Sequence, residues 1–206
     1  MSNNTIICIF VEGETEKAFY KKVIEHIKAR FKSDLTNCEI KYFNIEGISR
    51  FQNKALNRFK SKISGEHKYK NYKKIAVFCY DTDVFELSQA KPVVNWEKLE
   101  RDFKDNGANI TIHIKAKKSI EDTFLIDING IVNFLKLKNT SINSLKGSGF
   151  EKMKQLFKKA NRVYLKGTKV DGLVESLNID LICKNQCQNY RSLCELLRRN
   201  QQKKCE

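Results

Sequence analysis

Two acidic clusters each follow an apolar run rich in β-branched residues. They are Glu12, Glu14 and Glu16 behind the first run, and Asp81 and Asp83 behind the second. Carboxylates gathered in one place repel each other and take up protons unless a cation balances them. Oxygen ligands without cysteine or histidine select hard ions such as Mg²⁺ or Mn²⁺. The sequence therefore predicts a divalent-metal site if the fold brings the two clusters together.

The spacing within each cluster suits such a site. Asp81 and Asp83 straddle one residue, which in extended backbone points both side chains the same way. Glu12 and Glu16 both face the same crevice if a helix begins between them, and Gly13 permits a tight turn and a close backbone approach to phosphate. Two ions held in this way activate a water and stabilise the leaving oxygen of an in-line phosphodiester displacement.

Each cluster alone also has a purely structural interpretation. The negative charges of Glu14 and Glu16 would interact favourably with the dipole at the start of a helix. Asp81 and Asp83 would suit a turn with an N-capping aspartate. The occurrence of both clusters, each at the end of a strand-like run, favours the metal site over two unrelated caps.

Apolar runs alternate with amphipathic stretches, which is typical of a parallel sheet wrapped by helices. Strands are predicted over 5–11, 39–44, 74–80 and 109–114. Helices are predicted over 14–31, 50–63, 95–105, 120–125, 129–137, 150–160, 169–176 and 189–199. Ligands of open parallel sheets bind at the carboxyl ends of the strands. The two acidic clusters should therefore meet at that edge.

The length of 206 residues fits one ordered domain with its own core. Within it we expect an α/β core over 1–138 and a C-terminal helical extension over 139–206, packed on the core. The polar loop 140–149, which carries Gly and Ser, marks the boundary.

A basic composition indicates a phosphate-bearing partner. Lys and Arg number 39 against 24 Asp and Glu, a net charge of +15, which attracts nucleic acid. The excess of Lys, Asn and Ile also fits a soluble basic protein from an AT-rich genome. The predicted nucleic-acid-binding residues on the basic helix are Arg50, Lys54, Arg58, Lys60 and Lys62. We expect these, with Lys152, Lys154, Lys158 and Lys159, to flank the acidic crevice.

Other classes of protein lack support in the sequence. No run reaches the roughly 18 to 20 apolar residues of a membrane span, and the polar start predicts a cytoplasmic protein. The seven cysteines contain no C-x-x-C pair, and Cys183 and Cys187 have no nearby histidine, so reduced structural thiols are favoured over zinc ligands. His113 alternates with apolar strand residues and is predicted to be partly buried. No G-x-x-x-x-G-K-[ST] motif for an ATPase occurs.

A family resemblance rests on the same residues. The strand followed by Val11-Glu12-Gly13-x-Thr15-Glu16, and the later strand followed by Asp81-x-Asp83, resemble the TOPRIM signature of topoisomerases, bacterial primases, recombination proteins and OLD-family nucleases. The segment 119–122 (SIED) and the short chain are more similar to the stand-alone OLD and RloB-like group. The likeness covers about 5–125 and, more weakly, 166–177. It implies a TOPRIM (Rossmann-like), mostly parallel four-stranded sheet flanked by helices.

The resemblance also implies roles for individual residues. Glu12, Asp81 and Asp83 would hold one Mg²⁺ or Mn²⁺, and Glu16 and Glu121 would help to hold a second. A late lysine would support the transition state, with Lys169 the first candidate and Lys166 its rival. The implied catalytic set is Glu12, Glu16, Asp81, Asp83 and Lys169.

The implied activity is metal-dependent cleavage of DNA or RNA phosphodiester bonds. The family further implies a role in anti-phage defence and a separately encoded ATPase as a partner. Two alternatives stay open. One is an RNA- or tRNA-processing TOPRIM ribonuclease, and the other is a metal-dependent module that grips nucleic acid through the basic helix without cutting it.

Overall fold

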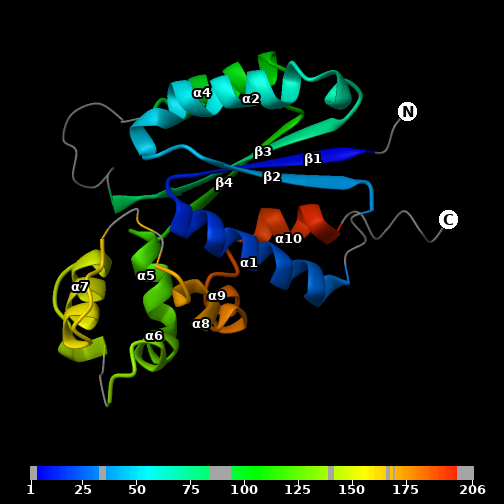
Figure 1. Cartoon of the computed structure of the whole chain (residues 1–206). Coiled ribbons are helices and arrows are strands. Elements are labelled where there is room, and N and C mark those ends of the chain that lie inside the picture. Colours follow the sequence, from blue (N-terminus) through cyan, green and yellow to red (C-terminus); the bar gives the residue numbers. More distant parts are fainter. Residues whose placement is uncertain are drawn as a thin grey trace.

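A four-stranded, all-parallel sheet forms the centre of the molecule (Figure 1). The computed structural model describes residues 4–32, 36–83, 94–138, 142–165, 168 and 170–198. The strands are β1 (Thr5–Val11), β2 (Cys38–Asn44), β3 (Lys73–Asp81) and β4 (Ile110–Ala116), in the spatial order β2-β1-β3-β4. The predicted α/β class is confirmed. The ends of each predicted strand differ by at most two residues from the ends of the observed strand.

Helices cover both faces of the sheet, as Figure 1 shows. On one face α1 (Glu14–Phe31) packs against Ile7 and Ile9, and on the other α4 (Trp96–Asp105) packs against Phe10. Successive side chains of β1 thus enter different cores, and a strand buried on both faces reads as one apolar run.

The connections that follow the two central strands, β1 and β3, lie on opposite faces of the sheet. Helix α1, which connects β1 to β2, lies on one face, whereas α4, which connects β3 to β4, lies on the other. The order β2-β1-β3-β4 therefore places a topological switch point between β1 and β3. Ligands of open α/β sheets bind at the carboxyl side of such a point.

The segment between β2 and β3 is helical, as predicted, but of mixed type. It consists of η1 (Ile48–Arg50), the π-helical η2 (Phe51–Ala55), α2 (Leu56–Phe59) and the π-helical η3 (Lys60–Ser64). Its buried residues Phe51, Ala55, Phe59 and Ile63 recur every four positions. In a pure α-helix, such a stripe would turn steadily around the helix axis. The wider π turns compensate for this rotation and hold the four side chains on one face.

The rest of the chain is helical. Its elements are α5 (Ile120–Phe124), η5 (Leu125–Asp127), α6 (Ile128–Phe134), η6 (Ile142–Ser144), α7 (Gly149–Lys159), α8 (Leu173–Ser176), α9 (Ile179–Asn185) and α10 (Arg191–Arg198). Met153, Leu156 and Phe157 of α7 belong to the same buried cluster as Ile7 of β1. The described part of the C-terminal helices thus shares one core with the sheet.

Two helices of the C-terminal part, α8 and α9, differ most from the prediction. The helix expected over 169–176 begins only at Leu173, because Gly172 at φ 81° interrupts the chain before it. Helix α9 was not predicted, although Asn178 caps it by accepting a hydrogen bond from Leu181 N.

His113, Cys8 and Cys79 were not predicted to bind a metal, and each is wholly or partly buried in the fold. His113 Nε2 lies 2.9 Å from Glu100 Oε1, and burial lowers the pKa of this half-buried imidazole. Cys8 and Cys79 are buried free thiols, and burial raises the pKa of Cys8 to about 12. In the described ranges, no helix combines the length and apolar character that crossing a membrane requires.

Candidate functional site

The two acidic clusters meet at the switch point. Glu12 directly follows β1 and Asp81 ends β3, and these strands are hydrogen-bonded neighbours. Glu12 Oε1 accepts a hydrogen bond of 2.9 Å from the backbone N–H of Asp81, 69 residues away. The clusters that the sequence predicted to share one edge of the sheet are therefore in direct contact.

A second contact brings in the residues behind β4. Asp81 Oδ1 accepts a 2.8 Å hydrogen bond from the backbone N–H of Ile120, which immediately precedes Glu121. The backbone N–H groups of Thr82 and Asp83 both donate to Lys118 O, at 2.7 and 2.9 Å. The segments that follow β3 and β4 are thus tied together, and one hydrogen-bonded network joins Glu12, Asp81 and Ile120, the residue before Glu121.

The first turn of α1 separates two glutamates with different roles. Glu14 is exposed and accepts hydrogen bonds from Asn44 Nδ2 (2.8 Å) and from Lys17; the bond from Asn44 is the main reason that its pKa is lowered. Glu14 therefore fastens α1 to the end of β2. A Cβ atom on Gly13 would lie 2.6 Å from Glu16 Oε2. Any other residue at position 13 would thus displace the carboxylate of Glu16.

Tyr164 joins the site from the segment after α7. Its hydroxyl donates to Glu121 Oε1 at 3.2 Å, and its ring is buried. Burial raises the pKa of Tyr164, and the negative charges of Glu121, Glu16 and Asp81 raise it further. Because Coulomb effects weaken with distance, these contributions indicate that Glu16 and Asp81 lie in the neighbourhood of Tyr164, while Glu121 is in direct contact with it. No spacing in the sequence marks this tyrosine, which is 43 residues from its partner.

Asp83 and Glu121 each have a buried carboxylate oxygen that accepts no hydrogen bond from the described part of the chain. These oxygens are Asp83 Oδ1 and Glu121 Oε2. Burying a carboxylate oxygen without a partner is costly, and a cation is the usual compensation. Across the residues that the structure describes, no three Asp, Glu, His or Cys side chains are already grouped as a complete ligand set. Glu12 Oε1 and Asp81 Oδ1 each accept a hydrogen bond from a backbone N–H group.

The predicted lysines, Lys166 and Lys169, lie outside the described residues. Between them, Thr168 is described, and its carbonyl accepts a 3.1 Å hydrogen bond from Thr15 Oγ1. Thr15 is the buried threonine of the Glu12-Gly13-x-Thr15-Glu16 motif. This contact anchors residue 168 to the first turn of α1, next to Glu16.

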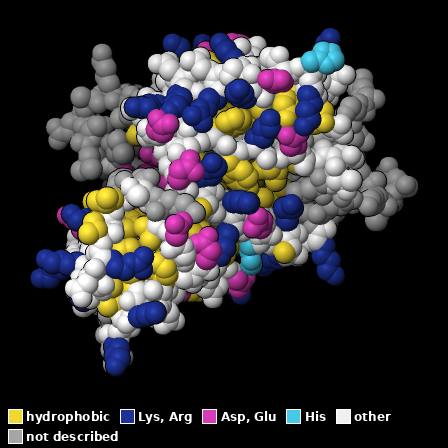
Figure 2. Space-filling model, in the orientation of Figure 1, with side chains coloured by type: hydrophobic (Ala, Val, Ile, Leu, Met, Phe, Trp, Pro, Cys, Tyr) yellow, Lys and Arg dark blue, Asp and Glu magenta, His cyan; other side chains and the backbone are white. Residues whose placement is uncertain are grey.

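The basic helix begins beside the site and runs away from it. Gly47 N donates to Glu12 O at 3.0 Å, and the helical segment starts one residue later. Arg50 and Lys54 both form salt bridges with Glu46, at 2.8 and 2.7 Å, and Arg58 contributes to lowering the pKa of Glu46. Figure 2 shows Lys and Arg side chains in a row over α2.

The predicted basic residues thus differ in their distance from the site. Lys60 and Lys62 lie ten or more residues beyond Arg50, roughly 15 Å further along a helix axis. Only the start of the basic helix adjoins the acids, and there its charge is shared with Glu46.

The described site is a set of oxygen donors at the carboxyl edge of β1, β3 and β4. Its donor type fits a hard divalent cation, and the switch point is where open α/β sheets bind ligands. Comparison of the chain with protein-family models, curated proteins and solved structures found no match.

Proposed function

We propose that the protein is a divalent-metal-dependent nuclease whose site is the network around Asp81. One observation carries the proposal: Asp81 is bonded to Glu12 through its backbone N–H and to the start of α5 through its carboxylate. Acids from three separate strand ends are brought together in this way at a ligand-binding edge. Structural caps alone do not require that convergence.

The residues present fit a hard cation by their donor type and by the two unpartnered oxygens of Asp83 and Glu121 in the described chain. Glu12, Asp81 and Asp83 would hold one Mg²⁺ or Mn²⁺, and Glu16 and Glu121 a second. When bound, such ions supply an activated water and charge stabilisation of the leaving oxygen.

Tyr164 has a positioning role in this proposal. Its hydroxyl donates a hydrogen bond to Glu121 Oε1, which holds that carboxylate in place. Gly13 leaves room for the carboxylate of Glu16. Lys169 is proposed to support the transition state on the basis of the TOPRIM resemblance alone.

Nucleic acid is the proposed substrate because of the net charge of +15. The TOPRIM resemblance supports phosphodiester chemistry and a defence role against phage, with a separately encoded ATPase as the proposed partner. These biological assignments rest on the resemblance.

A cleavage assay on four substrates tests the proposal. The purified protein is incubated with plasmid, single-stranded DNA, ribosomal RNA and tRNA in Mg²⁺, in Mn²⁺ and in EDTA. We expect cleavage of at least one substrate with metal and none in EDTA. Cleavage of tRNA alone would favour the RNA-processing alternative, and binding without any cleavage would favour the non-cutting module. Cutting that survives EDTA would contradict the proposed chemistry.

A further inference from the structure

Helix α7 and the segments on either side of it line an open surface cavity of about 630 Å³. Four cationic side chains line it: Lys146, Lys154, Lys158 and Arg162. A volume of this size lies within the range of roughly 300 to 1,000 Å³ that ligand sites occupy. The cavity is therefore large enough for part of a bound molecule, and the charged side chains in its lining are mostly cationic.

The positive charge of this cavity is only partly offset by the acid that lines it. In the described part of the chain, none of the four cations forms a salt bridge, although the charge of Lys154 acts on nearby Glu151. The one lining carboxylate, Glu151, accepts hydrogen bonds from Ser148 N (2.7 Å) and Ser148 Oγ (3.1 Å) in the capping box of α7. The bond from the Ser148 backbone is the main reason that its pKa is lowered. Arg50 and Lys54 differ, since both pair with Glu46.

The walls of the cavity are held in place. The Arg162 guanidinium lies over the rings of Phe134 and Phe157, at 4.7 and 5.4 Å from their centroids. The Gln155 side chain donates to Lys146 O at 2.6 Å and accepts from Lys146 N at 3.3 Å. A cationic surface that is already ordered loses less entropy when it binds.

Apolar groups accompany the charges. Val163 and Leu165 are 76% and 58% exposed on either side of buried Tyr164, as expected for alternating side chains of an extended segment. Figure 2 shows hydrophobic side chains gathered over α5, α6 and α7, with Lys and Arg at the margin. Cations beside apolar surface match an unpaired nucleic-acid strand, which offers phosphates and uncovered base faces together.

The cavity adjoins the carboxylates through a single residue. Tyr164 lines the cavity, and its hydroxyl is bonded to Glu121. We propose that the α7 cavity is the surface on which an unpaired nucleic-acid strand lies, with its phosphates on Lys154, Lys158 and Arg162, as it enters the site. The assignment of this strand as the substrate rests on the proposed nuclease function, whereas the binding itself does not.

The test is a binding measurement in EDTA, where metal-dependent cleavage is absent. Fluorescence anisotropy of labelled single-stranded DNA and RNA is compared for wild type and the double variant Lys154→Glu/Lys158→Glu. The matched control is Lys70→Glu/Lys73→Glu, the same charge change on exposed residues at the opposite edge of the sheet. We expect the α7 variant to lose at least tenfold in affinity and the control to stay within about twofold. The salt slope should fall by about 1.4, or 0.7 for each lost contact.

Several results would overturn the proposal. They are an equal loss of affinity in the α7 variant and the control, wild-type affinity in the α7 variant, duplex binding as tight as strand binding, and full competition by polyglutamate. Circular dichroism verifies that both variants are folded.

The outcomes for binding and cleavage are separable. Wild-type protein that binds the strand through α7 but cuts nothing in Mg²⁺ or Mn²⁺ would support the cavity and refute the nuclease. Conversely, an α7 variant that cuts nucleic acid and binds the strand with wild-type affinity would refute strand binding at the α7 cavity, but not the nuclease function.

Discussion

The Asp83→Asn protein is expected to cleave nucleic acid at least about 100-fold more slowly than wild type in Mg²⁺ or Mn²⁺, a loss of about 2.7 kcal/mol of transition-state stabilisation. Asparagine keeps the shape of the side chain but removes the charge that balances an ion. Asp83 Oδ1 accepts no hydrogen bond from the described residues, so the change breaks no described contact of that oxygen. Initial cleavage rates of the two proteins at saturating metal give the comparison.

A stability measurement accompanies this variant. Without metal, its free energy of unfolding should equal or exceed that of wild type, because repulsion among neighbouring carboxylates falls. Asp105→Asn, at the exposed end of α4, is the matched control and should cut at the wild-type rate. A folded Asp83→Asn protein with wild-type activity would refute the catalytic role of this carboxylate.

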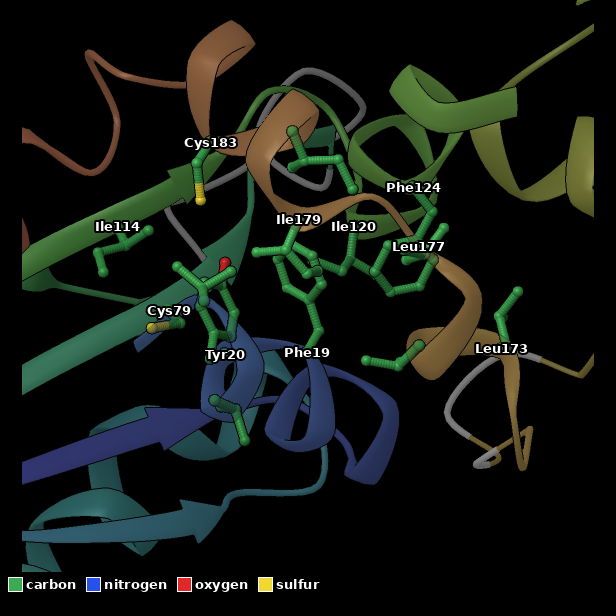
Figure 3. Packing of buried hydrophobic residues seen from close by; sticks show 14 of the residues in the cluster. Phe19, Tyr20, Cys79, Ile114, Ile120, Phe124, Leu173, Leu177, Ile179 and Cys183 are labelled. Atoms are coloured by element: carbon green, nitrogen blue, oxygen red, sulfur yellow. The ribbon is translucent and has the colours of Figure 1, made fainter. Parts of the chain in front are cut away.

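Phe124→Ala is expected to lower the free energy of unfolding by about 3 to 5 kcal/mol, the range for truncating a buried phenylalanine. The ring of Phe124 is fully buried in α5, and its centroid lies 5.2 Å from that of Phe19 in α1. Figure 3 shows these rings among the side chains of Ile120 and Leu177. The contact joins the helix that carries Glu16 to the helix that carries Glu121. Urea unfolding followed by circular dichroism measures the change.

Two further variants calibrate that result. Phe124→Leu keeps most of the buried volume and should cost less than Phe124→Ala. Leu165→Ala removes a side chain that is 58% exposed and should shift the free energy by about 0.5 kcal/mol or less. A loss below about 1 kcal/mol for Phe124→Ala would mean that the structure collapses into the space left by the ring and that the contact between α1 and α5 contributes little to stability.

The sheet was predictable because its residues carry strong local signals. β1 and β3 are buried on both faces and therefore appear as continuous apolar runs. Helix α1 was predicted with its observed bounds, since Phe19, Val23, Ile24 and Ile27 repeat at helical spacing. The contact between Glu12 and Asp81 followed from these strands, because parallel strands end at one edge.

Other features depend on contacts that no local pattern encodes. Tyr164 reaches Glu121 across 43 residues, and Thr15 reaches Thr168 across 153. The distribution of positive charge over the surface could not be predicted either, because Lys and Arg are frequent throughout the chain. Only the folded structure shows that Arg50 shares its charge with Glu46, whereas Lys158 lines a cavity without a salt bridge to any described residue.

Binding of a hard divalent cation by the carboxylates behind β1, β3 and β4 is tested most directly by titrating metal-free protein with Mn²⁺ and following free Mn²⁺ by electron paramagnetic resonance. We expect saturable binding that Mg²⁺ displaces and that the double variant Glu12→Gln/Asp83→Asn loses by at least tenfold in affinity. Both variant side chains keep their shape, and circular dichroism verifies their fold. Wild-type Mn²⁺ affinity and stoichiometry in that double variant, or no saturable binding to the folded wild-type protein, would contradict a metal site at this edge of the sheet.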